Sequence, residues 1–323
     1  GQMNLIYQFD KKYIKPLSNN FVWLTEHLGN QTTPHIPIKN FDVAVSAMDE
    51  IRQEQMAPDL LITYGGHIVS KQIKKYLRNH PPKEHWHIAS DGKIADLFGC
   101  LTTVIEMDPF EFLEKIAFLL DNKPTNYPLM WENWCKIIPE PNLPYSQISV
   151  TGDLIKALPI PCSLHLANSS TVRYAQLFAL PKEVEVCCNR GVNGIEGSLS
   201  SAIGYAAAST QTNFVIIGDL SFFIDMNALW MSHVRSNLRI LLFNNEGGEI
   251  FHTLPGMEKN SQSRPFITAE HQTSAKGWAE ERGFQYIKVT NADEWTDALP
   301  ILTSPEEHPK PMLVEVVTDK DTD

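Results

Sequence analysis

Two polar residues that follow apolar runs carry the clearest chemical signal in the chain. Asp219 follows the run VIIG, and Asn245 follows LLFN, with one helix-length segment between them. Carboxylate and amide oxygens are hard ligands that suit Mg²⁺. A structural interpretation stands beside this one, because Asp and Asn at such junctions often cap helices or form turns. The spacing by itself leaves both interpretations open.

The residues beside this pair suit a negatively charged ligand. Gly247 and Gly248 follow Asn245 and permit a sharp turn that brings the backbone close to a ligand. The helix predicted after Asp219 would point free N–H groups and a positive dipole end at an anion. The chain contains neither GxxxxGK[ST] nor GxGxxG, so the ordinary nucleoside triphosphate and dinucleotide cradles are not indicated. The chemical hypothesis is a magnesium diphosphate site of another kind.

The elements around these residues predict a parallel sheet. Short apolar runs alternate with helical patterns, which is typical of α/β domains built from βαβ units. In the second part of the chain we predict strands at 162–168, 184–189, 213–219, 239–245 and 311–317. Helices are predicted at 148–159, 169–180, 195–209, 222–234 and 273–283. Because ligands bind outside the carboxyl ends of such strands, four residues that end these runs should converge on one crevice: Asn168, Asn189, Asp219 and Asn245.

The first part of the chain predicts a second domain of the same class. Strands are expected at 21–26, 60–66 and 85–90, and helices at 40–56, 70–80 and 110–122. A proline-rich stretch with prolines at 124, 128, 139, 141 and 144 then marks a domain boundary near residue 145. We therefore predict two doubly wound parallel-sheet domains, 1–144 and 145–323.

Composition excludes several classes of function. The 323 residues carry a formal net charge of -11, which argues against nucleic acid as a partner. No apolar run approaches the roughly 18 residues of a membrane span, and the N-terminus lacks a signal-peptide pattern, so a cytoplasmic protein without a membrane partner is expected. Five cysteines without a CxxC spacing argue against a disulfide framework or a zinc site.

Three segments together resemble one enzyme family. GDLSFFIDMNALW…NNEGGEIF resembles the thiamin diphosphate motif, which begins with GD and ends with NN. NRGVNGIEG and LANSSTVRYAQLF are similar to segments of the MenD family, the 2-succinyl-5-enolpyruvyl-6-hydroxy-3-cyclohexene-1-carboxylate (SEPHCHC) synthases of menaquinone biosynthesis. The resemblance covers the whole chain and is strongest after residue 160. It implies a central domain, similar to transhydrogenase domain III, followed by a diphosphate-binding domain.

The resemblance also assigns roles to residues around the cofactor. It implies that Mg²⁺, or Mn²⁺, is held by Asp219, Asn245 and the carbonyl of Gly247. Thiamin diphosphate would lie against Gly218, Asp219, Leu220, Ser221, Asn245, Gly247, Gly248 and Ile250, with Ile195 as the apolar wedge under the bent cofactor. The cofactor supplies the electron sink for decarboxylation of 2-oxoglutarate and for addition of the succinyl semialdehyde carbanion to isochorismate.

Contacts to the substrates are implied at six further positions, each with a plainer alternative. Arginine forks match carboxylates, and the resemblance assigns contacts to substrate carboxylates to Ser169, Arg173 and Arg190. Without the resemblance, these residues would be interpreted as a helix cap and two surface ion pairs. Ile250 and Phe251 match an apolar pair beside the reacting carbon, or a piece of core. Lys71 matches an isochorismate contact, but a solvated basic helix face with Lys74, Lys75 and Arg78 explains it equally well.

The family also contains parts that this chain lacks. Its members carry an N-terminal pyrimidine-binding domain with an activating glutamate, and GQMN resembles the turn after the first strand of the central domain. We expect a fragment that is catalytically inactive alone. Small residues at 197, 198, 200, 201, 202 and 204 permit close helix packing, either on the protein's own sheet or across subunits. The resemblance implies the latter, in a homodimer or homotetramer. The alternatives are another carboligase of the acetolactate synthase kind and a non-enzymatic binding subunit.

Overall fold

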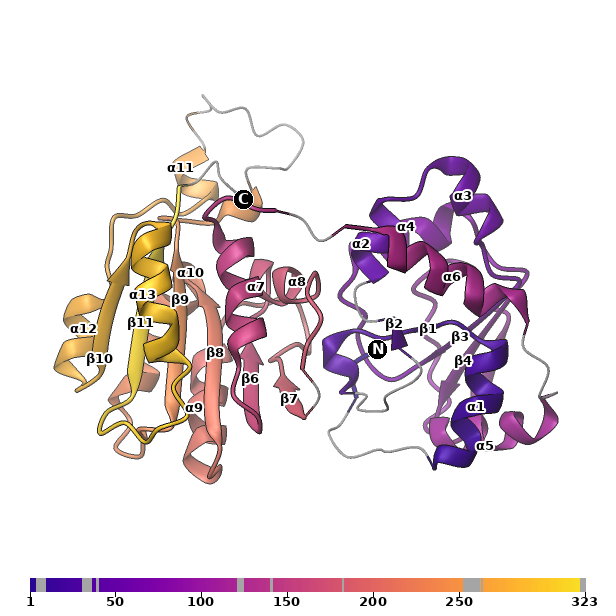
Figure 1. Ribbon diagram of the computed structural model, residues 1–323, viewed down its shortest axis with the longest axis horizontal. Coiled ribbons are helices and arrows are strands. Elements are labelled where there is room, and N and C mark those ends of the chain that lie inside the picture. The colour runs from indigo at the N-terminus through magenta and orange to yellow at the C-terminus, as the bar shows by residue number, and fades with distance from the viewer. Residues whose placement is uncertain are drawn as a thin grey trace. The chain divides into compact units, whose positions relative to one another are not determined.

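The computed structural model describes residues 1–3, 10–30, 37–38, 41–120, 125–139, 142–181, 183–251, 262 and 264–319. The chain divides into two compact units, Gly1–Pro141 and Asn142–Asp323 (Figure 1). Both are α/β with parallel strands, which confirms the predicted fold class. Asn4 of GQMN and the prolines at 124 and 141 lie outside the described residues.

The second unit is built on a six-stranded parallel sheet. Its order is β10-β11-β9-β8-β6-β7. The strands are β6 (Cys162–Leu166), β7 (Val184–Cys187), β8 (Thr212–Gly218), β9 (Leu238–Asn244), β10 (Gln285–Val289) and β11 (Met312–Val317). The chain moves from β6 to its neighbour β7 and then crosses back to β8 on the other side of β6. The order therefore reverses between β6 and β8, the kind of position where α/β sheets bind ligands.

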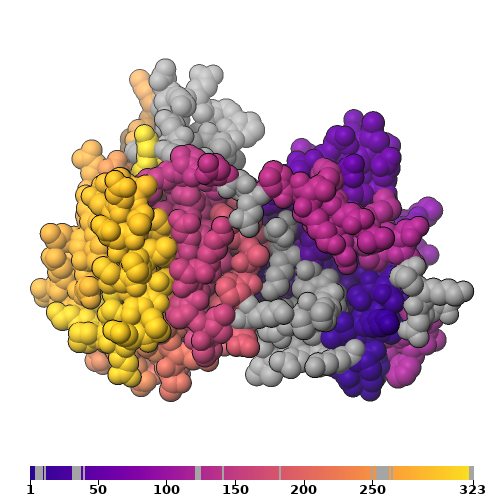
Figure 2. Space-filling model, viewed as in Figure 1, coloured from indigo at the N-terminus to yellow at the C-terminus, as the bar shows by residue number. Residues whose placement is uncertain are grey.

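Helices cover both faces of this sheet. On one face lie α9 (Ser198–Ala208), α10 (Asp219–Asp225), η2 (Met226–Trp230) and α12 (Lys276–Glu281), which share a buried cluster with β8 and β9. The other face carries α7 (Gln147–Ala157), α8 (Ser170–Ala175) and α13 (Ala292–Leu302), with α7 and α13 at the front of this unit (Figures 1 and 2). Two short elements complete the unit, η3 (Glu249–Phe251) and α11 (Arg264–Ile267). Coverage on both faces explains the continuous apolar runs of β8 and β9.

The first unit holds two separate parallel sheets among its described residues. One is the three-stranded sheet β3-β4-β5, formed by β3 (Leu60–Tyr64), β4 (Glu84–Ala89) and β5 (Thr103–Glu106). The other pairs β1 (Trp23–Leu24) with β2 (Pro37–Ile38). The helical elements are α1 (Lys11–Asn20), η1 (His27–Gly29), α2 (Phe41–Ser46), α3 (Glu50–Gln55), α4 (Lys71–Asn79), α5 (Pro109–Leu119) and α6 (Asn126–Ile137).

Several elements differ from the sequence prediction, which contains neither the helices α1 and α13 nor the strands β5 and β10. The single helix expected at 40–56 is two helices. The first ends at Ser46, and Asp49 caps the second, its Oδ1 accepting the N–H of Arg52 at 2.8 Å. The helix expected at 222–234 instead begins at Asp219 and tightens into the 3₁₀ turn η2. The proline-rich stretch contains α6, whose Trp131 is 1% exposed in the core of the first unit. No helix in the described part of the chain is long and apolar enough to cross a membrane.

Candidate functional site

Asp219 and the turn after β9 meet at one edge of the second unit's sheet. β8 and β9 are adjacent and parallel, with Gly218 opposite Phe243, so both strands end at the same level. The Asp219 carboxylate is 3% exposed, and its Oδ2 accepts the N–H groups of Asn245 at 3.2 Å and Gly247 at 3.0 Å. Its Oδ1 accepts the N–H of Leu220 at 2.6 Å. The structure thus brings together the three residues that the resemblance assigns to a metal.

Glycine is required in this turn. Gly247 has φ 153°, and a Cβ there would lie 2.9 Å from the carbonyl oxygen of Thr268. A Cβ on Gly248 would lie 2.8 Å from the ring of Phe251, while its N–H donates to the Thr268 carbonyl at 2.6 Å. A side chain at Gly247 would clash with the backbone of Thr268, whereas one at Gly248 would require the ring of Phe251 to move.

A buried glutamate anchors the same turn from behind, and the sequence analysis missed it. Glu315 on β11 is 0% exposed. Its Oε1 accepts the side-chain amide of Asn244 at 2.7 Å and the N–H of Ala275 at 3.2 Å. Its Oε2 accepts the hydroxyls of Ser274 at 2.7 Å and Tyr286 at 2.5 Å. Because a buried carboxylate is stabilised only when donors surround it, Glu315 joins β9, β10, β11 and the start of α12 into one rigid support.

Asn244 connects Glu315 to the turn at 245–248. Its amide nitrogen also donates to the Thr273 carbonyl at 2.9 Å, and its Oδ1 accepts the N–H of Glu246 at 3.1 Å. Glu246 adopts φ 62°, the left-handed region. The first asparagine of the NN pair, Asn244, therefore shapes the turn. The backbone N–H of the second, Asn245, contacts the carboxylate of Asp219.

His271 is a second residue that the sequence analysis missed. Its Nε2 lies 3.3 Å from Oδ2 of Asp219, although this approach lacks hydrogen-bond geometry. Its Nδ1 accepts the N–H of Thr273 at 3.1 Å, so a neutral ring carries its proton on Nε2, on the side of the carboxylate. Burial raises the pKa of Asp219, while hydrogen bonds from backbone N–H groups and the charge of His271 act in the opposite direction.

A second polar cluster lies at the carboxyl ends of β6 and β7. Asn168 is 5% exposed; its amide donates to the Gly194 carbonyl at 2.8 Å and its Oδ1 accepts from the guanidinium of Arg190. The guanidinium of Arg173 donates to the carbonyl of Ser169, one turn earlier on α8. Ser169 itself has φ 83° and ψ -124°, a conformation rare for residues other than glycine. Such strain is commonly stored at functional sites.

Ser221 links the start of α10 to the loop that follows β7. Its hydroxyl donates to the carbonyl of Ile195 at 2.5 Å, which places half-buried Ile195 next to the residues after Asp219. Gly218, just before them, has an ordinary φ of -82°. A Cβ built on Gly218 would meet nothing within 4 Å, so the protein's own packing does not require glycine there. This open space at the end of β8 fits a bound group.

The remaining predicted residues are more dispersed. Ile250 and Phe251 form η3 directly after the glycine turn, where Ile250 is half-buried and Phe251 is 37% exposed. Lys71 is exposed at the first position of α4, after the cap Ser70, and belongs to the first unit. The other candidates belong to the second unit.

The donor set at Asp219 suits Mg²⁺. A carboxylate, an amide oxygen and a backbone carbonyl are the hard oxygen ligands that this ion uses, with water or phosphate completing six positions. Within the described ranges there is no group of three or more His, Cys, Asp and Glu side chains placed to hold a metal ion. The oxygens of Asn245 and Gly247 would therefore have to supplement Asp219, as the resemblance implies.

Comparison with known proteins defines the class. Residues 168–316 match the family described as "Thiamine pyrophosphate enzyme, C-terminal TPP binding domain". The matched segment includes Asp219 and Asn245, at the edge of the sheet. Residues 168–316 are therefore similar to the C-terminal domain of thiamine pyrophosphate (thiamin diphosphate) enzymes.

Three curated relatives of the chain share one name. The chain is 75% identical to the 2-succinyl-5-enolpyruvyl-6-hydroxy-3-cyclohexene-1-carboxylate synthase of Phocaeicola vulgatus, over 100% of this chain and 58% of that protein. It is 65% identical to the synthase of that name from Bacteroides fragilis, over 100% of this chain and 58% of that relative. With the synthase of Flavobacterium psychrophilum it shares 34% identity over 98% of this chain and 57% of the relative. The chain thus spans less than two thirds of the length of these relatives.

Proposed function

We propose that this chain is part of a thiamin diphosphate- and Mg²⁺-dependent SEPHCHC synthase. The reaction would decarboxylate 2-oxoglutarate and join the remaining four-carbon unit to isochorismate, in menaquinone biosynthesis. The observation that carries the proposal is the carboxylate of Asp219 held against the Asn245–Gly247 turn, in a chain 75% identical to a protein of that name.

The second unit would act as the diphosphate-binding domain. Asp219, the side-chain oxygen of Asn245 and the carbonyl of Gly247 would hold Mg²⁺ or Mn²⁺. Gly218, Leu220, Ser221 and Gly248 would line the diphosphate, whose charge the metal offsets. When bound, the cofactor supplies an electron sink for decarboxylation. Ile195 and Ile250 would support it with apolar surface.

The polar cluster after β6 and β7 would orient the substrate. Arg190 is 9% exposed, and its Nε is buried without a hydrogen-bond partner. A substrate carboxylate would satisfy such a group, because a guanidinium fork matches a carboxylate. Arg173, Ser169 and Phe251 would complete this side of the pocket. Lys71, in the proposed central domain, would contact isochorismate, as the resemblance implies.

The test compares two aspartates of α10 in the longer protein. Asp219→Asn should abolish Mg²⁺-dependent binding of thiamin diphosphate in calorimetry. Asp225→Asn is the matched control, since Asp225 ends the same helix and its Oδ2 accepts from the N–H of Ser200 at 2.8 Å; its binding should be unchanged. Unaltered affinity in Asp219→Asn would refute the metal role.

Two further assays address the whole reaction. The longer protein should consume 2-oxoglutarate and isochorismate together, and consumption of pyruvate instead would favour an acetolactate synthase-like enzyme. Residues 1–323 alone should show no turnover, because the proposal places the activating glutamate elsewhere in the protein. Sedimentation of the longer protein should give a homodimer or homotetramer.

A further inference from the structure

One buried side chain contacts both ends of the loop between β7 and α9. This loop, residues 188–197, carries Arg190 and Ile195, to which the proposed function gives a substrate contact and a cofactor support. Asn168, two residues after β6, is 5% exposed. Its Oδ1 accepts from the guanidinium of Arg190, and its Nδ2 donates to the carbonyl of Gly194 at 2.8 Å. A single amide thus holds Arg190 directly and Ile195 through the peptide group before it.

The two partners of Asn168 require an acceptor and a donor in one side chain. A guanidinium has N–H donors and no acceptor, whereas a backbone carbonyl has no donor. The amide oxygen of Asn168 must therefore face Arg190 and the nitrogen must face Gly194, as in the structure. An aspartate would lose the donor, and an alanine would lose both hydrogen bonds. The two contacts thus explain why an amide occupies position 168.

A neutral acceptor orients Arg190 without neutralising it. In the part of the chain that the structure describes, Arg190 forms no ion pair, and its Nε is buried without a hydrogen-bond partner. Hydrogen bonds from a guanidinium to a carboxylate are roughly twice as strong as those between neutral groups. A carboxylate at position 168 would therefore occupy the guanidinium that a substrate carboxylate needs. The amide of Asn168 fixes the direction of the guanidinium and leaves its charge available.

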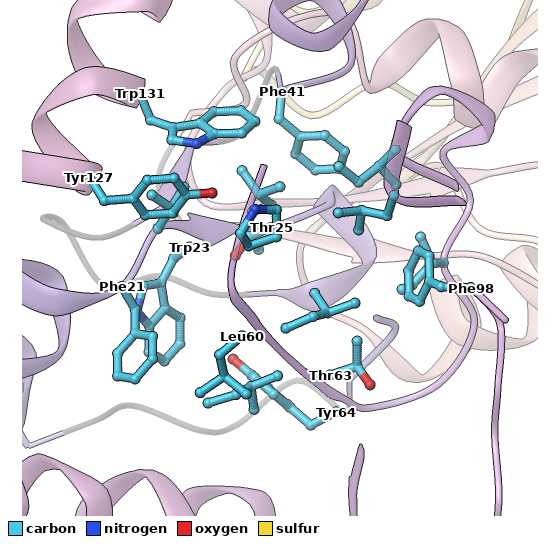
Figure 3. Close-up of a pocket in the computed structure, with 18 of the residues that line it drawn as sticks. Phe21, Trp23, Thr25, Phe41, Leu60, Thr63, Tyr64, Phe98, Tyr127 and Trp131 are labelled. Atoms are coloured by element: carbon cyan, nitrogen blue, oxygen red, sulfur yellow. The ribbon is translucent and has the colours of Figure 1, made fainter. Parts of the chain in front are cut away.

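An apolar cavity in the first unit offers no comparable place for a carboxylate. This cavity of about 450 Å³ lies between β1 and β3, and the rings of Phe41, Tyr127 and Trp131 line it (Figure 3). None of the described residues that line it is a lysine, an arginine or a histidine. A carboxylate without a partner in apolar surroundings is costly. The guanidinium of Arg190 is therefore the better-suited contact for a substrate carboxylate.

The amide of Asn168 also contributes to the placement of Ile195. The carbonyl of Ile195 accepts the hydroxyl of Ser221 at 2.5 Å, from the first turn of α10. The consecutive carbonyls of Gly194 and Ile195 are therefore held by side chains from two elements, the end of β6 and the start of α10. A residue has only two soft backbone dihedrals, which lie between its two flanking peptide groups. Because both flanking groups of Ile195 are held, its backbone conformation is fixed.

Given the proposed function, on which this role rests, we infer that Asn168 is a positioning residue of the site. It fixes the Arg190 guanidinium for a substrate carboxylate and, through Gly194, fixes Ile195 for the cofactor. A residue that merely closes the loop would behave differently. Its loss would lower substrate affinity, cofactor affinity and stability together, whereas the effects of a positioning residue separate along its two hydrogen bonds.

Cofactor binding by the longer protein tests the contact with Gly194. Asn168→Asp keeps an acceptor for Arg190 but removes the donor to Gly194. It should weaken Mg²⁺-dependent binding of thiamin diphosphate in calorimetry by about three- to tenfold, the usual range for one hydrogen bond. Asn168→Ala should show a similar loss, which excludes the added charge as its cause. Arg190→Ala keeps the donor and should bind the cofactor as the wild type does.

The matched control for this measurement is Asn213→Asp. Asn213 is 0% exposed, and its amide donates to the carbonyl of Gln211 at 2.7 Å, at the amino end of β8. The substitution is the same, but the position lies at the end of the strand opposite Asp219, so cofactor affinity should not change. Unaltered affinity in Asn168→Asp, or an equal loss in Asn213→Asp, would overturn the inference.

Kinetics of the longer protein at saturating thiamin diphosphate test the contact with Arg190. Asn168→Ala should raise KM for at least one of the two carboxylate substrates by about tenfold. In an Arg190→Ala background the same change should raise that KM by no more than about twofold, because residues that share one interaction are not additive. An equal rise in both backgrounds, or no rise in either, would show that Asn168 does not act through Arg190.

The proposed function and the role of Asn168 fail in different ways. A wild-type longer protein that binds thiamin diphosphate without turnover of 2-oxoglutarate and isochorismate would refute the proposed function. The calorimetric comparison of Asn168→Asp with Asn213→Asp would still test Asn168, because it needs no turnover. A wild type that turns over both substrates, with Asn168 variants that match it in KM and cofactor affinity, would refute the positioning role alone.

Discussion

The imidazole of His271 faces the carboxylate of Asp219, with Nε2 3.3 Å from Oδ2, at the sheet edge where we place the cation. The ring is fixed on its other side by the N–H of Thr273 and packs edge-on against Phe223, with 5.3 Å between ring centroids. Residues that orient a metal ligand without touching the metal commonly change affinity by 10- to 100-fold. His271 has the position of such a residue.

His271→Ala should therefore weaken Mg²⁺-dependent binding of thiamin diphosphate by at least about tenfold. The affinity is measured by calorimetry on the longer protein. His233→Ala provides the control, because His233 is exposed, and its affinity should not change. Equal dissociation constants for the wild type and His271→Ala would show that Asp219 is oriented without the imidazole.

Glu315→Gln should both destabilise the second unit and disturb the turn at 245–248. The amide would present a donor to groups that now donate to Glu315, and each buried donor left without an acceptor costs about 1–3 kcal/mol. We expect a loss of about 3 kcal/mol in denaturant unfolding. Glu185→Gln is the control, since half-buried Glu185 accepts from Tyr205 at 2.5 Å and should lose about 1 kcal/mol or less. A loss below that of Glu185→Gln would contradict the anchoring role.

The sequence predicts two residues of the candidate site, Asp219 and Asn245, because they lie at strand ends. Asp219 and Asn245 directly follow β8 and β9, which are neighbours, so an alternation of strands and helices suffices to bring them together. Glu315 and His271 have no such signal. Glu315 lies within an apolar strand and reaches Asn244 only because β11 inserts between β9 and β10. His271 lies in a loop whose path depends on tertiary contacts.

The helices show the same limit in the first unit. A run of apolar spacing predicts one helix at 40–56, but the local cap at Asp49 divides it. The prolines near 128 suggest a linker, yet Pro128 falls in the first turn of α6, where a missing N–H costs little. Packing of Trp131 then stabilises a helix that propensity alone does not indicate.

Trp131→Ala should accordingly destabilise the first unit by about 3–5 kcal/mol, the usual cost of emptying a buried aromatic position. Chemical denaturation followed by circular dichroism measures this loss. Trp230→Ala is the control, because Trp230 is 68% exposed and its removal should change stability by about 0.5 kcal/mol or less. A similar small effect at Trp131 would mean that α6 is not part of the core.

His165 should make the second unit acid-sensitive. Burial lowers the pKa of His165 from 6.5 to about 4, and the hydrogen bond to Asn213 only partly opposes this. In the unfolded chain the imidazole takes up a proton near its ordinary pKa, while the folded chain keeps it neutral. Stability is therefore fully present above about pH 6.5 and declines as the pH falls toward 4.

The expected loss from His165 is about 2 kcal/mol between pH 7.5 and pH 5, given about 1.4 kcal/mol for each pKa unit. His165→Gln should remove this part of the pH dependence in urea titrations, whatever its effect at neutral pH. His233→Gln, at an exposed site, should retain it. If the free energy of unfolding changes equally between the two pH values in His165→Gln and in the wild type, another group causes the pH dependence.

Gly218→Ala separates the needs of the fold from those of the cofactor. The backbone at Gly218, with φ -82° and ψ 162°, is ordinary for alanine, and a Cβ there meets no protein atom within 4 Å. Unfolding free energy should therefore stay within about 0.5 kcal/mol of wild type.

If the open space receives the diphosphate, the added methyl group should weaken thiamin diphosphate binding at least about tenfold, an amount equal to about 1.4 kcal/mol. Gly277→Ala, on exposed α12 surface with equally open space, should leave binding unchanged. Tight binding by Gly218→Ala would place the diphosphate elsewhere, because no rearrangement of the protein is needed to accommodate that methyl group.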